Sequence, residues 1–207
     1  MSQMSHKILN ILVVGDGAVG KTSLLNAYSG APFGGLYEPT IYDKKAFEIT
    51  LNGQIHTVQL HDTAGQEEFE RLRRHFYKNA DCFLLCYSIN NVVTYENIIN
   101  TWIPDLTTEH HIPIVLIGTK SDLRDNPDNA VVSTDAGEKL SLLIKANAFV
   151  ECSAKLSENI ELAVHEAVRV CSQGVPDPEP EPARWCGLCC CRSTTYHHPE
   201  QTVAFRR

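Results

Sequence analysis

The sequence predicts an α/β fold: a six-stranded mixed sheet with helices on both faces. Apolar segments of strand length alternate with segments of helical periodicity along the chain. A glycine-rich loop directly follows the first apolar segment, as at the ligand-binding edge of a parallel sheet. Two extended segments are joined by Asn52-Gly53, which predicts a hairpin with a type I′ turn and adds one antiparallel edge strand. These observations together predict a doubly wound sheet with right-handed crossovers.

Each element follows from its local pattern. Residues 8–14 are mostly apolar and end at Gly15, as expected of a strand that is covered on both faces. Residues 21–29 follow as a helix that Gly30 closes. The remaining predicted elements are the hairpin strands 44–51 and 54–60, the strands 81–87, 112–117 and 149–152, and the helices 92–107, 134–146 and 158–172.

Composition divides the chain into a domain, residues 6–173, and a tail, residues 174–207, that begins rich in proline and acidic residues. The formal charge of −7 argues against a nucleic-acid-binding protein. No apolar run approaches the ~20 residues that span a bilayer. The start of the chain has no signal-peptide cleavage site, and Ser2 replaces the glycine that N-myristoylation needs. We therefore expect a cytoplasmic protein. We also expect it to be monomeric.

The loop after the first strand matches the phosphate-binding pattern G-x-x-x-x-G-K-[ST]. Its glycines let consecutive backbone N–H groups turn toward phosphate oxygens, and the next helix directs its positive end at them. Lys21 is expected to reach the β- and γ-phosphates, and the Thr22 hydroxyl to bind Mg²⁺. The nucleotide-binding residues expected in this segment are Gly15, Asp16, Gly17, Ala18, Val19, Gly20, Lys21, Thr22 and Ser23.

The same segment also satisfies G-x-G-x-x-G, the dinucleotide-binding fingerprint. That alternative requires a second parallel strand after the helix, ending in an acidic residue. A hairpin follows instead, and the fingerprint has no role for Lys21-Thr22, so we favour the phosphate loop. A glycine-rich turn without a ligand is a further alternative, which the motifs below disfavour.

A second motif, Asp62-Thr-Ala-Gly65-Gln66, follows the second hairpin strand. A carboxylate at a strand end opposite a phosphate loop suits a Mg²⁺ ion bound to a nucleotide. Gly65 can bring its N–H against a γ-phosphate because it has no side chain. Gln66 has both a donor and an acceptor, which suit it to orient a water molecule. Taken alone, the segment could also be a turn with a charged face.

Two further motifs indicate guanine as the base. Asp122 can accept hydrogen bonds from the N1–H and the exocyclic amine of guanine, which adenine does not offer in that arrangement. The stem of Lys120 can pack over the base, and the segment around Ala154 can bring a backbone N–H near the guanine O6. For this last segment alone, an ordinary loop remains an alternative. The expected base-binding residues are Thr119, Lys120, Asp122, Leu123, Ser153, Ala154 and Lys155.

With these motifs the chain resembles the Ras-like small GTPases over roughly residues 6–173, and within them the Rho family. The Rho-like motifs are the phosphate loop, Thr119-Lys-Ser-Asp-Leu-Arg-Asp125 and Thr101-Trp-Ile-Pro-Asp105. The resemblance implies the P-loop NTPase fold of a small G domain that binds GTP and GDP with Mg²⁺. It also implies a first switch, in which Thr40 binds Mg²⁺ and γ-phosphate, Phe33 contacts the guanine and Tyr37 closes over the phosphates. A second switch would run from residue 62 to about 78.

The resemblance further implies a slow GTP hydrolase that cycles between two nucleotide states to control effector binding. Gln66 would orient the attacking water, while Lys21 and the Gly65 N–H contact the transferred phosphate. The implied partners are a guanine-nucleotide exchange factor, a GTPase-activating protein and effectors in actin-cytoskeletal or membrane-linked signalling. We interpret Arg71, Arg73 and Arg74 as solvated or partner-facing. A non-hydrolysing, nucleotide-bound signalling scaffold and a metabolic P-loop kinase remain alternatives.

Three features depart from the Rho pattern. Only residues 126–133 separate the T-K-x-D motif from the next helix, so the extra helix of Rho proteins is not expected. His61 replaces a tryptophan used in exchange-factor selection, so the activator cannot be inferred. The chain ends in Val-Ala-Phe-Arg-Arg207, without a C-a-a-X box, so prenylation is in doubt.

Eight cysteines form two groups. One group lies in apolar segments and is expected to be reduced: Cys82, Cys86, Cys152 and Cys171. The other crowds into the tail and is our candidate for palmitoylation, which would attach the protein to the cytoplasmic face of a membrane: Cys186, Cys189, Cys190 and Cys191. Zinc binding by Cys186 and Cys189 with His197 or His198, or a plain reduced tail, are the alternatives.

Overall fold

The computed structural model describes residues 8–34, 40–51, 53–107, 112–124 and 131–173, and they contain the predicted six-stranded mixed sheet. The strands lie in the order β2-β3-β1-β4-β5-β6. β2 pairs antiparallel with β3, and the other neighbouring pairs are parallel. The strands are β1 (Ile8–Gly15), β2 (Tyr42–Leu51), β3 (Gln54–Thr63), β4 (Cys82–Ser88), β5 (Ile114–Thr119) and β6 (Ala148–Cys152).

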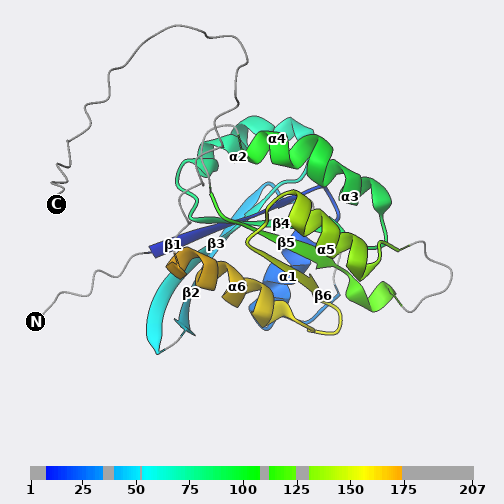
Figure 1. Ribbon diagram of the computed structural model, residues 1–207. Helices are drawn as coiled ribbons and strands as arrows, with labels where there is room; N and C mark the ends of the chain where they lie inside the picture. Colours follow the sequence, from blue (N-terminus) through cyan, green and yellow to red (C-terminus); the bar gives the residue numbers. More distant parts are fainter. Residues whose placement is uncertain (1–7, 35–39, 52, 108–111, 125–130, 174–207) are drawn as a thin grey trace, which may run out of the picture. The chain divides into compact units, whose positions relative to one another are not determined.

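Helices cover both faces of this sheet (Figure 1). One face carries α1 (Lys21–Tyr28) and α6 (Ile160–Gln173). The other carries α2 (Glu70–Tyr77), α3 (Val92–Asn97), α4 (Ile103–Leu106) and α5 (Thr134–Leu143). Three short turns complete the described elements: the 3₁₀ turns η1 (Glu67–Phe69) and η3 (Ser121–Leu123), and the π-helical turn η2 (Ile98–Trp102).

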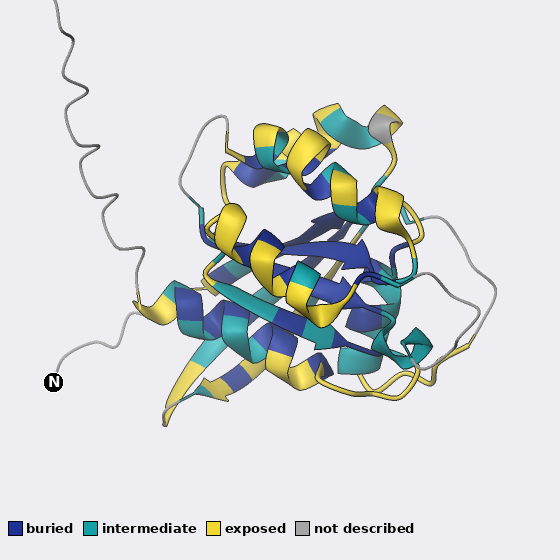
Figure 2. Cartoon of the chain, turned by 45° about the vertical axis from the view of Figure 1, so that its right-hand side comes forward, coloured by how far each residue is buried: buried dark blue, intermediate teal, exposed yellow. Residues whose placement is uncertain are grey.

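Alternate residues of the central strands supply two separate cores. On β1, Ile11 and Val13 belong to the core beneath α1 and α6, whereas Leu12 and Val14 belong to the other. All seven residues of β4 are buried, and the strand interiors contrast with the exposed outer sides of the helices (Figure 2). Burial on both faces explains why these strands are predominantly apolar and lack regular polar alternation.

The hairpin forms where the sequence predicts it. Leu51 pairs with Gln54, so only two residues separate the paired strand ends. Gly53 has a φ of 76°, in the left-handed region that a type I′ turn requires. Asn52 lies outside the described residues, so the turn type stays a prediction.

Two helical segments differ from the sequence prediction. α2 is a helix that the sequence pattern does not predict. The predicted single helix over residues 92–107 is instead α3, η2 and α4 in succession. Pro104 accounts for the interruption, because it lacks an N–H and its ring clashes with the carbonyl four residues earlier. The wider π turn just before it accommodates the ring.

The other predicted bounds differ from the observed ones by at most three residues. None of the helices in the described ranges is long and apolar enough to cross a lipid bilayer. The division into a domain and a tail at residue 173 stays a prediction; α6 ends at that residue.

Candidate active site

The phosphate loop joins the carboxyl end of β1 to the first turn of α1. Gly15 has a φ of 136°, and a Cβ atom there would overlap the carbonyl oxygen of Cys86 on β4. Gly20 has a φ of 108° and forms the N-cap of α1, so its conformation also favours glycine. The loop can therefore bend tightly over the sheet edge and present its backbone to a ligand.

Lys21 points back into this loop from the start of α1. Its ammonium donates hydrogen bonds to the carbonyls of Gly15 at 2.8 Å and Asp16 at 2.7 Å. The side chain is buried, and burial lowers the pKa of the ammonium. A cation so placed can contact phosphate oxygens at the mouth of the loop.

Three oxygen-bearing side chains meet beside the phosphate loop. The Thr22 hydroxyl donates to Asp62 Oδ2 at 2.6 Å and lies 2.8 Å from the Thr40 hydroxyl. Asp62 is buried, which raises the pKa of its carboxyl, and its Oδ1 has no hydrogen-bond partner among the described residues. A buried carboxylate oxygen without a donor is costly unless a cation or water satisfies it. These donors fit a hard cation such as Mg²⁺, which prefers oxygen ligands.

The segment after β3 approaches the phosphate loop closely. A Cβ atom at Gly65 would overlap the carbonyl oxygen of Gly15 and the backbone of Asp16, so only glycine allows this approach. Gln66 is exposed and lines the same cavity of about 370 Å³ as Lys21, Thr22 and Thr40. The site thus brings together residues from three distant segments of the chain.

A second cavity of about 220 Å³ adjoins the first and is lined by the predicted base-binding residues other than Ser153, which is fully buried. Asp122 accepts a hydrogen bond from the Ser153 hydroxyl at 2.6 Å on Oδ1, and Lys155 Nζ lies 3.8 Å from Oδ2. The carboxylate is therefore oriented by groups outside the base. The cavity lining includes Phe33, Lys120, Asp122, Leu123, Ala154 and Lys155.

Two residues of the base-binding loop hold the phosphate loop directly. The Thr119 hydroxyl donates to the Val19 carbonyl at 2.5 Å. Lys120 Nζ donates to the Ala18 carbonyl at 3.0 Å, and burial lowers its pKa. The two cavities are consequently parts of one ligand-binding cleft.

The family follows from comparison with known proteins. The sequence model of the family described as "Ras family" matches residues 10–173. The chain belongs to the Ras family. The Ras-like GTP-binding protein RhoL of Drosophila melanogaster is 43% identical over 166 residues, which are 80% of this chain and 87% of the fly protein. Members of the family bind guanine nucleotides and hydrolyse GTP, so the predicted family and enzyme class are confirmed.

The interpretation of Arg73 in this Ras-family GTPase as solvated or partner-facing is wrong. Arg73 is 5% exposed, and its Nη1 donates to the carbonyls of Ala64 at 2.9 Å and Gln66 at 2.6 Å. Arg74 is exposed but pairs with Glu70 and Asp105, both at 2.7 Å. A buried guanidinium can compensate otherwise unpaired backbone carbonyls, which the sequence alone does not indicate.

Sequence analysis also missed the partners of Asp16 in this GTPase. Its carboxylate points toward α3 and η2 rather than into the cleft, and accepts hydrogen bonds from Asn97 and Trp102. Trp102 belongs to a motif that carried the family resemblance, but nothing in its spacing indicated a contact with the phosphate loop.

Several predicted positions lie outside the described residues. They are Tyr37 of the first switch and the tail cysteines Cys186, Cys189, Cys190 and Cys191, whose roles stay predictions. The other four cysteines of this GTPase form no disulfide among the described residues, in line with the prediction, and burial raises the pKa of Cys152 to about 12.

Proposed function

We propose that this Ras-family GTPase is a Rho-type switch that uses Mg²⁺ with GTP and GDP to control effector binding. The observation that carries this proposal is the meeting of Thr22, Thr40 and Asp62. These residues belong to the phosphate loop and to the two candidate switch segments. A ligand that contacts these residues can therefore change the conformation of both switch segments. The likeness to a fly protein named RhoL supports the Rho-type assignment.

Hydrolysis transfers the γ-phosphoryl group of GTP to water. The water oxygen attacks the γ-phosphorus while the bond to the β-phosphate oxygen breaks, which yields GDP and inorganic phosphate. Gln66 lies at the cleft, where its amide can orient that water. Lys21 and the backbone N–H groups of the loop stabilise the charge that develops on the leaving side.

Thr22 and Asp62 would hold Mg²⁺, with Thr40 joining them when the γ-phosphate is present. When bound, the ion would supply positive charge that stabilises the negative charge of the phosphate groups. Asp62 Oδ1, which has no donor among the described residues, suits a role in that site. Loss of the γ-phosphate would release Thr40 and Gly65, and the partner surface would change with them.

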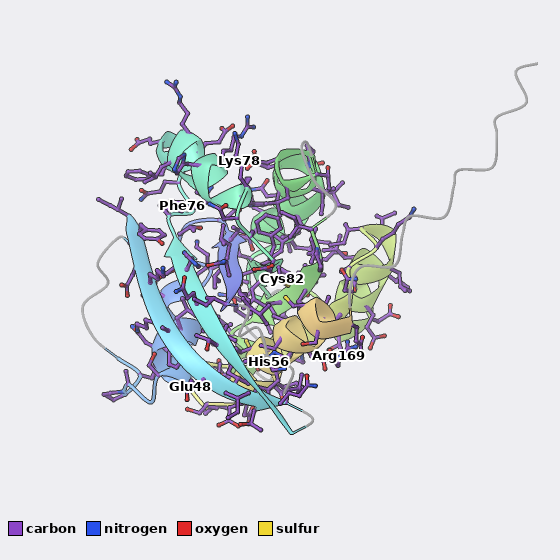
Figure 3. The ribbon with its side chains drawn as sticks, turned by 90° about the vertical axis from the view of Figure 1, so that its left-hand side faces the viewer. Glu48, His56, Phe76, Lys78, Cys82 and Arg169 are labelled. Carbon is purple, nitrogen blue, oxygen red and sulfur yellow. The ribbon has the colours of Figure 1, made fainter. Side chains whose placement is uncertain are left out.

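The surface between the two switches differs from that of many Rho proteins at a position that affects the choice of exchange factor. Phe76 lies on α2 (Figure 3). Tyr42 at the start of β2 stacks on it, with ring centroids 4.4 Å apart. The Tyr42 hydroxyl lies 2.7 Å from Nδ1 of His61, which stands where many Rho proteins have tryptophan. Because exchange factors contact this region in the Rho family, we propose an activator that differs from those that select tryptophan.

Gln66→Leu is the direct test of the hydrolytic mechanism. Single-turnover phosphate release from purified wild-type protein should proceed on the order of 10⁻⁴ to 10⁻³ s⁻¹, the scale of Ras, a relative. The variant should keep its nucleotide affinity but lose hydrolysis stimulated by a GTPase-activating protein, because leucine cannot orient water. Glu68→Gln, an exposed neighbour, is the matched control and should behave as wild type. Stimulated hydrolysis that persists in Gln66→Leu would place water orientation elsewhere.

Removal of Mg²⁺ tests the cation site. Metal and nucleotide affinities are reciprocally coupled, typically by ~5–150-fold, so excess EDTA should speed release of a fluorescent GDP analogue by about tenfold or more. Thr22→Val keeps the side-chain shape but removes the hydroxyl, and should make release fast with or without EDTA. If EDTA does not change the release rate of the wild-type protein, the cluster of Thr22, Thr40 and Asp62 is not the Mg²⁺ site.

A further inference from the structure

Trp102 joins the phosphate loop to the helical face of the protein. Its indole N–H donates to Asp16 Oδ1 at 2.7 Å, and the Asn97 amide donates to Oδ2 at 2.7 Å. Both carboxylate oxygens of Asp16 are thus held by residues that follow it by 81 and 86 positions. Hydrogen bonds to a charged acceptor are stronger than neutral ones. They fix the loop residue whose own carbonyl accepts from Lys21.

The other side of the same indole faces the second switch. The guanidinium carbon of Arg73 lies 4.8 Å from the centroid of the Trp102 ring, within range of a cation–π contact. Arg73 Nη1 binds the carbonyls of Ala64 and Gln66, the residues on either side of Gly65. Its buried Nε has no hydrogen-bond partner among the described residues. The ring therefore contributes to holding this cation in place.

Separate contacts hold the rest of α2. Arg74 Nε and the Tyr77 hydroxyl bind the two carboxylate oxygens of Asp105, at 2.7 and 2.8 Å. These bonds dock the helix on α4 without Trp102. A change at Trp102 should therefore affect the Ala64–Gln66 backbone rather than detach α2 as a whole.

We propose that Trp102 is a positioning residue for GTP hydrolysis. By binding Asp16 on one side and supporting Arg73 on the other, it sets the distance between the phosphate loop and the backbone of Gly65 and Gln66. The π turn η2 places the indole at this point, and Pro104 imposes the turn. The inference rests on the proposed catalytic role of this segment. It adds a residue that touches neither nucleotide nor water.

Trp102→Phe tests the connection to the phosphate loop, because it keeps an aromatic ring beneath Arg73 but removes the N–H. Loss of one hydrogen bond to a charged acceptor should lower the single-turnover hydrolysis rate about tenfold. The GTP and GDP dissociation rates and the thermal unfolding midpoint of the GDP-bound protein should stay close to wild type. A purely structural role would instead lower stability and leave the hydrolysis rate of the folded protein unchanged.

Tyr95→Phe is the matched control. It also removes one hydrogen bond from α3, but that bond, to the Ala136 carbonyl at 3.1 Å, joins α3 to α5 and not to the phosphate loop. Its hydrolysis rate should remain within twofold of wild type. Trp102→Phe with equally unchanged hydrolysis would overturn the proposal.

The connection to the second switch is tested at Arg73. Lysine keeps the charge over the indole and can still bind a carbonyl, whereas methionine keeps only the bulk of the side chain. Hydrolysis should therefore fall about tenfold in Arg73→Met and by less in Arg73→Lys, which keeps the charge but loses the planar guanidinium. Equal rates in the two variants would contradict a role for the positive charge over the indole.

Trp102 fluorescence gives a readout that does not depend on hydrolysis. The chain has two tryptophans, so a Trp185→Phe background leaves Trp102 as the single reporter. Its emission should differ between the GDP form and the form with a non-hydrolysable GTP analogue, and Arg73→Met should abolish the difference. No difference in the background protein would overturn the link to the second switch.

Gln66→Leu measured in parallel separates this inference from the proposed function. If Trp102→Phe slows hydrolysis while Gln66→Leu does not, the positioning acts through Gly65, and the role proposed for Gln66 is wrong. If Gln66→Leu slows hydrolysis while Trp102→Phe does not, the proposed function stands and the positioning role fails.

Discussion

Asp122→Asn should convert this GTPase from a guanine-binding to a xanthine-binding protein. The carboxylate is expected to accept hydrogen bonds from the guanine N1–H and exocyclic amine, and an amide would face that amine with a donor of its own. Xanthine has a carbonyl at this position, which the amide can satisfy. Sites that hydrogen-bond a ligand group discriminate by ~10⁴–10⁵-fold against an analogue that lacks this group. The affinity of the variant for GDP should therefore fall by at least about 100-fold. Competition of XDP and GDP against a fluorescent nucleotide measures both changes.

Ser153→Ala is the comparison variant for Asp122→Asn. It removes the hydroxyl that donates to Asp122 Oδ1 at 2.6 Å but leaves the carboxylate in place. We expect weaker binding of guanine nucleotides without any preference for xanthine. If Asp122→Asn still prefers guanine, Asp122 is not the residue that recognises the base.

Gly65→Ala should disable the response to the γ-phosphate. The added methyl group would overlap the backbone of Gly15 and Asp16, and neither neighbour is a flexible side chain that can rotate away. The segment must move outward, which removes its N–H from the γ-phosphate and displaces Gln66. Loss of one pre-positioned donor typically lowers kcat by ~10²–10³-fold, so hydrolysis should fall about 100-fold or more.

GDP affinity is the internal control for Gly65→Ala, because GDP has no γ-phosphate for this N–H to contact. Calorimetry should show binding of GDP close to wild type and weaker binding of a non-hydrolysable GTP analogue. Equal losses for the two nucleotides would mean that the substitution damages the cleft generally. Hydrolysis at the wild-type rate would show that the close approach of Gly65 is unnecessary.

Continuous burial made the central strands predictable. β1, β4 and β5 are covered on both faces over most of their length, so each is a predominantly apolar run. The phosphate loop was predictable for a different reason, since its glycines and Lys21 act within one short segment. Features that depend on one short segment can be predicted from that segment alone.

α2 was missed because its inward face mixes aromatic side chains with a buried arginine. Its buried residues are Arg73 and Tyr77, so the helix lacks the stripe of apolar side chains on which periodicity depends. The same arginine was misinterpreted because its acceptors are backbone carbonyls, which every residue has. The Asp16–Trp102 contact joins positions far apart in the chain, and only the assembled fold brings them together.

The bonds from Thr119 and Lys120 to the carbonyls of Val19 and Ala18 have a consequence for nucleotide exchange. A protein that moves the phosphate loop outward must break these two hydrogen bonds. The movement would therefore also disturb the residues expected to bind the purine ring, without direct contact with them. A displacement at the phosphate end of the cleft is thereby coupled to the base end. We therefore expect a displacement of the phosphate loop to weaken the contacts around Thr119 and Lys120 as well.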